Sequence, residues 1–93
     1  MGHLYTIICE YDGGTYVAQV NANSPRAALL SWLEGKDIRD QIPTDVQKDV
    51  REELVSSSGP VAINGCQNTW CHTSSSNKGL VLINIVRTHS GGA

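Results

Sequence analysis

Two runs of strand-forming residues flank the tripeptide Asp12-Gly13-Gly14 near the start of the chain. Glycine accepts the positive φ angles of tight hairpin turns, so this pattern predicts a β-hairpin. With Gly13 and Gly14 as a two-residue loop, we expect four cross-strand pairs: Tyr11 with Tyr16, Cys9 with Ala18, Ile7 with Val20, and Tyr5 with Ala22. These eight side chains would share one face of the hairpin, and that face would need another element packed against it.

Ser24-Pro25 marks a change from strand to helix. Ser24 is a typical N-cap, proline is favoured at the first helical position, and Gly35 is a typical C-cap. The pattern therefore predicts a helix between Ser24 and Gly35. Its apolar stripe, which suits packing across the hairpin, consists of Ala28, Leu29, Trp32 and Leu33.

A second helix is expected after Pro43. Thr44 and Gln47 have the spacing of a capping box, which places the helix from Thr44 to about Val55. Its apolar side consists of Val46, Val50 and Leu54, and its other side is charged. In the charged connector before it, one helical turn is expected at Asp37 to Gln41.

The last third of the chain predicts a second strand pair. Asn68 to Thr73 and Leu80 to Arg87 are the expected strands, joined by a polar loop from Ser74 to Gly79. The final strand is apolar on both faces, with Leu80, Leu82 and Val86 on one and Val81, Ile83 and Ile85 on the other. Such a strand is typically central in its sheet and covered on both sides.

The order of these elements predicts one α+β domain over residues 1–93. We expect a mainly antiparallel four-stranded sheet, in the chain order β-β-α-α-β-β, with two helices packed on one face. Because the helices can cover only one face, a second copy of the protein would cover the other. The sequence therefore predicts a homodimer with Val81, Ile83 and Ile85 at its interface, and a disordered tail over residues 89–93.

Composition narrows the class of protein. Seven Lys and Arg face nine Asp and Glu, for a net charge of −2, and the basic residues are scattered. Nucleic-acid binders concentrate basic charge, so no nucleic-acid partner is expected. No apolar run is long enough to span a membrane, and no basic segment precedes an apolar run as in a signal peptide, so no membrane partner is expected either. An odd number of cysteines, three in all, favours a reducing compartment, and we expect a cytoplasmic protein.

Cys66, Cys71 and His72 form the densest group of potential metal ligands. A structural zinc site needs four ligands, and no second ligand pair is present. Cys71 and His72 are adjacent on an expected strand, so their side chains should point to opposite faces. We therefore expect no metal, no cofactor and no catalytic residue, although a nucleophilic Cys66 with His72 as its base stays open.

Uncharged hydrogen-bonding residues gather around Trp70. They make this stretch the best candidate for a ligand or partner surface, because tryptophan is enriched at binding hot spots. The residues of this predicted surface are Asn64, Gln67, Asn68, Trp70 and His72. A simple polar loop beside a hairpin is the competing interpretation.

The segment from Tyr5 to Leu33 resembles HicB-type antitoxins. The shared features are a strand pair around Asp12-Gly13-Gly14, the Tyr16-Val17-Ala18 start of the second strand, and an alanine-rich helix after Ser24. Ser24-Pro25-Arg26-Ala27 replaces the acidic helix start of that family, and the family's third strand before the helix is absent. The resemblance implies a small dimeric α+β partner protein. In general style the chain is also similar to small bacterial proteins encoded on mobile gene cassettes.

Together these patterns favour a non-enzymatic binding or interaction protein that self-associates through its sheet. An antitoxin or immunity-type protein that masks a toxin is one alternative. A small enzyme or metal site that uses Cys66, Cys71 and His72 is another.

Overall fold

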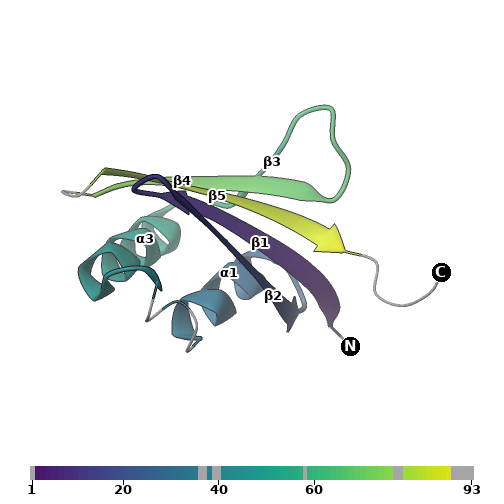
Figure 1. The fold of residues 1–93 in the computed structure, drawn as a ribbon. Coiled ribbons are helices and arrows are strands. Elements are labelled where there is room, and N and C mark those ends of the chain that lie inside the picture. The colour runs from purple at the N-terminus through teal and green to yellow at the C-terminus, as the bar shows by residue number, and fades with distance from the viewer. Residues whose placement is uncertain (1, 36–37, 39–40, 58, 77–78, 89–93) are drawn as a thin grey trace.

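The computed structural model describes residues 2–35, 38, 41–57, 59–76 and 79–88. Five antiparallel strands form one sheet in the order β2-β1-β5-β4-β3, and both helices lie on the same face of it (Figure 1). The elements are β1 His3–Tyr11, β2 Gly14–Ala22, α1 Pro25–Glu34, α3 Thr44–Ser56, β3 Val61–Ala62, β4 Thr69–Ser76 and β5 Gly79–Thr88. No helix in these ranges has the length and apolar character needed to cross a membrane.

The α+β class and the two helices on one face are confirmed, but the strand count is wrong. The fifth strand is β3, which pairs with β4 through Val61 opposite Cys71 and Ala62 opposite Trp70. Two residues are too few to display the alternation by which a strand is recognised in a sequence. Its pairing depends instead on the neighbouring β4.

The predicted polar loop from Ser74 to Gly79 is also wrong, because β4 continues to Ser76 and β5 begins at Gly79. Ser74 lies opposite Val81 and is fully buried. Serine has no strong strand preference, so the strand here is set by pairing with the apolar β5.

The β1–β2 hairpin turns at Asp12-Gly13, one residue earlier than predicted. Both residues have positive φ, 50° at Asp12 and 79° at Gly13, as a type I′ turn requires. Cys9 therefore pairs with Tyr16 and Ile7 with Ala18. This shifts each pairing by two residues, and because the strand period is two, every side chain stays on its predicted face.

The caps of α1 are confirmed and that of α3 is not. The hydroxyl of Ser24 accepts a hydrogen bond from the Ala27 N–H at 3.0 Å, and Gly35 is the C-cap. In α3, Thr44 is already helical and Pro43 is the N-cap, without a side-chain cap. Gln47 instead donates from Nε2 to the carbonyl of Ile42 at 2.7 Å, so it ties the helix to the preceding connector.

The core lies between the helices and one face of the sheet. Both predicted helical stripes are buried in it, as are the predicted side chains of β1. Val81, Ile83 and Ile85 belong to this core with exposures of 1%, 0% and 0%, so they are not available to a second copy. Their prediction as a dimer interface is corrected, because the helices cover this face of β5 and leave the face of Leu82 and Val86 open. The predicted tail at 89–93, and most of the predicted turn at Asp37 to Gln41, lie outside the described residues.

Ile83→Ala should lower the free energy of unfolding by about 2–5 kcal/mol, because it removes a fully buried side chain from the central strand. The matched control is Leu80→Ala on the same strand, at a position that is 60% exposed, where a change within about 0.5 kcal/mol is expected. Urea unfolding followed by circular dichroism measures both. Equal losses for the two variants would contradict this placement of β5.

Candidate functional site

The predicted surface around Trp70 is not one site. Asn64 and Gln67 are exposed in the loop between β3 and β4, which rises from the sheet on the side away from the helices (Figure 1). Trp70 and His72 lie opposite the core residues Ile85 and Ile83 of β5, so their side chains face the helix side. The strand period therefore separates residues that are close in the sequence.

Trp70 belongs to the edge of the core. Its ring packs edge-on against Tyr5, with centroids 6.0 Å apart and an interplanar angle of 62°. It is partly buried and packs against the core cluster. Its main contacts are therefore within the chain.

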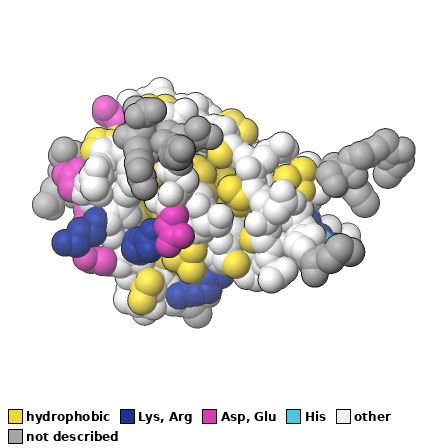
Figure 2. Space-filling model, turned by 90° about the horizontal axis from the view of Figure 1, so that it is seen from below, with side chains coloured by type: hydrophobic (Ala, Val, Ile, Leu, Met, Phe, Trp, Pro, Cys, Tyr) yellow, Lys and Arg dark blue, Asp and Glu magenta, His cyan; other side chains and the backbone are white. Residues whose placement is uncertain are grey.

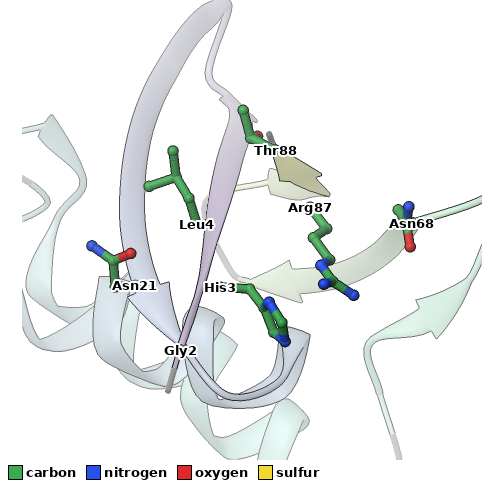
Figure 3. Close-up of a pocket in the computed structure, with 7 residues that line it drawn as sticks. All are labelled: Gly2, His3, Leu4, Asn21, Asn68, Arg87 and Thr88. Atoms are coloured by element: carbon green, nitrogen blue, oxygen red, sulfur yellow. The ribbon is translucent and has the colours of Figure 1, made fainter. Parts of the chain in front are cut away.

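Asn68 contributes to a polar pocket at the end of the sheet where β1 begins and β5 ends. Figure 3 shows His3 and Arg87 projecting to the same side, with Asn68 beyond Arg87, around a space of about 420 Å³. The sequence could not reveal this group, because the pairing of β5 with both β1 and β4 assembles it. His3, Asn68 and Arg87 are all exposed, and no hydrogen bond or ion pair holds their side chains within the described ranges. Nothing fixes these groups in a binding geometry.

A second cleft lies near the opposite edge of β4. It lies between the end of α3, the segment that follows it and β4, and its volume is about 620 Å³. Such a volume is within the range of small-molecule sites. Its walls include the apolar residues Val61, Ala62 and Ile63 and three titratable residues, Glu53, Cys71 and His72. The cleft exists because β3 pairs only as far as Cys71 and leaves the edge of β4 beyond that point without a strand partner among the described residues.

One wall of the cleft is held by Arg26 of α1. Its Nη1 donates to the carbonyl of Gly59 at 2.8 Å and to that of Ser57 at 3.3 Å. Gly59 is buried against His72, since a Cβ at this position would be 3.1 Å from Nδ1 of that ring. Ser57 and Gly59 are thus held by Arg26, and a larger residue at Gly59 would press on the imidazole of His72.

His72 is the most unusual polar side chain of the cleft. It is 7% exposed, and its Nε2 is buried without a hydrogen-bond partner. Burial lowers the pKa of His72 from 6.5, and the positive charge of Arg26 acts in the same direction. The Glu53 carboxylate and the backbone of Val50 act in the opposite direction, but burial dominates. The ring is therefore neutral near pH 7.

The cysteines are not assembled into a reactive or metal-binding group. Cys66 is exposed in the β3–β4 loop, and Cys71 lies on the opposite face of β4 from His72, as predicted. Within the described ranges, no three His, Cys, Asp or Glu side chains are placed to hold a metal. Cys9 is buried in the core, where burial and then Glu10 raise its thiol pKa to about 11, so it is a poor nucleophile.

The charged side chains are distributed unevenly. Figure 2 shows Lys, Arg, Asp and Glu side chains on the helix side of the molecule. On the open face of the sheet, Glu10 is the one charged side chain that the described strands contribute. The rest of that face consists of aliphatic, hydroxyl, thiol and amide side chains, including Ile8, Val17 and Leu82.

No family model matches the chain, and no match was found among curated proteins or among solved structures.

The depressed pKa of His72 should make stability depend on pH. The unfolded chain binds a proton below about pH 6.5, whereas the folded chain resists protonation, so the free energy of unfolding should fall as pH drops from about 7 to about 5. His72→Gln should flatten this slope, and His3→Gln, at an exposed position, should leave it unchanged. Urea unfolding across this range measures all three proteins. A His72→Gln slope as steep as that of the unmodified protein would show that burial does not perturb His72.

Proposed function

We propose that this protein is a non-enzymatic binding protein that self-associates through β2, an edge strand of its sheet. The single observation behind this proposal is that the edge has no protection. β2 is nine residues long, pairs with β1 alone among the described strands, and contains no charged residue and no proline. Natural proteins usually guard such an edge with charges, proline or a bulge, because its unpaired backbone groups can pair with another strand.

The strand at the other edge of the sheet, β3, is less open to further pairing than β2. β3 has only two residues and follows Pro60 directly. Short edge strands and prolines near an edge both limit further pairing. The far edge also includes β4 beyond Cys71, which is shorter than the nine residues of β2, so β2 is the edge better suited to receive a strand.

A second copy of the same strand is the occupant that fits. Two antiparallel β2 strands related by a two-fold axis at Ala18 would place Tyr16 opposite Val20 on the helix side. On the open face, Val17 would lie opposite Gln19. Aromatic and β-branched pairs of this kind stabilise a sheet by about 0.2–1 kcal/mol each, and no like charges meet across the axis. This pairing joins the two sheets edge to edge and does not place one sheet over the face of the other.

The edge can be blocked without touching the core. Val17 is 62% exposed and Gln19 is exposed, so V17K/Q19K should fold, yet it would place lysines opposite lysines at the two-fold axis. At micromolar concentrations we expect the unmodified protein to sediment as a dimer and V17K/Q19K as a monomer.

The matched control is T73K/L80K, which adds two lysines at exposed positions of the same face but away from β2. It should remain dimeric. A monomeric unmodified protein would overturn the proposal. So would dissociation of T73K/L80K with an intact V17K/Q19K dimer, because that outcome indicates face-to-face packing of the sheets.

A further inference from the structure

The cleft beside His72 has the chemistry of a site for a small organic cation. Among the described residues, its lining contains one carboxylate, that of Glu53, and no lysine or arginine. More apolar than polar surface faces the cleft, and its apolar lining residues include Val61, Ala62 and Ile63 of the segment through β3. This combination suits a ligand with a positive head and an apolar body.

The negative end of the cleft has two sources. No lysine or arginine of the described ranges forms an ion pair with Glu53. The α3 helix also ends here, at Ser56, and a helix C-terminus carries partial negative charge. The Glu53 carboxylate and the end of the helix therefore attract a cation to the same region.

Arg26 places an opposing charge beside the cleft. Its guanidinium is engaged by the carbonyls of Ser57 and Gly59 and is not part of the cleft lining. At His72, where both charges are felt, the effect of Glu53 is larger than that of Arg26. The balance of the two favours a positive ligand.

His72 forms a floor of the cleft that does not repel such a ligand. Its ring is almost fully buried and one of its nitrogens has no partner, which is unusual for a polar group held inside a protein. It therefore places an uncharged ring beside the carboxylate.

We propose that this cleft binds small primary amines with an apolar or aromatic body, with the ammonium at Glu53 and the body against Val61 and Ile63. This proposal goes beyond self-association and does not depend on it, because the cleft lies at the β4 side of the sheet and β2 forms the opposite edge. A volume of about 620 Å³ accommodates a one-ring amine with room to spare.

The probe is 2-phenylethylamine, compared with 2-phenylethanol and 3-phenylpropionate, which have similar bodies but are neutral or negative. Titration followed by ¹H–¹⁵N correlation spectra should give saturable shifts at Ala62 and His72 with the amine, weaker binding of the alcohol, and none of the acid. A single exposed ion pair contributes up to about 1 kcal/mol, so the amine should bind about fivefold more tightly than the alcohol.

Glu53→Gln should abolish this preference, while Glu52→Gln should keep it. Glu52 is the matched control because it is the neighbouring carboxylate on α3 but is exposed and pairs with Lys48 at 3.9 Å. Equal binding of amine and acid, equal effects of the two substitutions, or shifts that do not saturate would each overturn the proposal. The V17K/Q19K protein should bind the amine unchanged, which separates this result from that of the self-association test.

Discussion

The hydrogen-bonded pairing of β5 with β1 on one side and β4 on the other is the interaction on which the rest of the structure depends. β5 comes last in the chain, yet it is the middle strand of the sheet. Ile83 and Ile85 are fully buried beneath the helices, while Leu82 and Val86 are half-buried on the open face. The N-terminal hairpin and the two helices can share one core only because this strand joins the β1–β2 half of the sheet to the β4–β3 half.

Local patterns in the sequence predict the local elements well. The alternation in β1 and β2, the Ser24 cap and the apolar stripe of α3 each depend on residues near one another, so the chain displays them directly. The facing of β5 is different, because both of its faces are apolar and periodicity alone cannot say which one the helices cover. For that reason, the predicted dimer interface of Val81, Ile83 and Ile85 was placed on the wrong face of β5, the one that the helices cover.

The same limit applies to the candidate sites. The opposite orientations of Cys71 and His72 follow from the strand period and were predictable. The cleft was not, because it depends on where β3 stops and on Arg26, more than thirty residues earlier, holding the carbonyls of Ser57 and Gly59. Likewise Asn68, His3 and Arg87 meet only through the pairing of three strands. These groups of residues form only through the pairing of strands that are far apart in the sequence. The local sequence around each residue therefore does not predict them.

The unlike edges of the sheet have a consequence for the size of any assembly. A sheet with two free edges can add copies without limit and grow into a fibre. Here a two-fold pairing would consume the long β2 edge of both copies. The edges left at either end would be the two-residue β3 strand next to Pro60 and the stretch of β4 that continues beyond Cys71. Because a two-fold contact uses the same strand of both copies, growth through β2 would terminate after one addition.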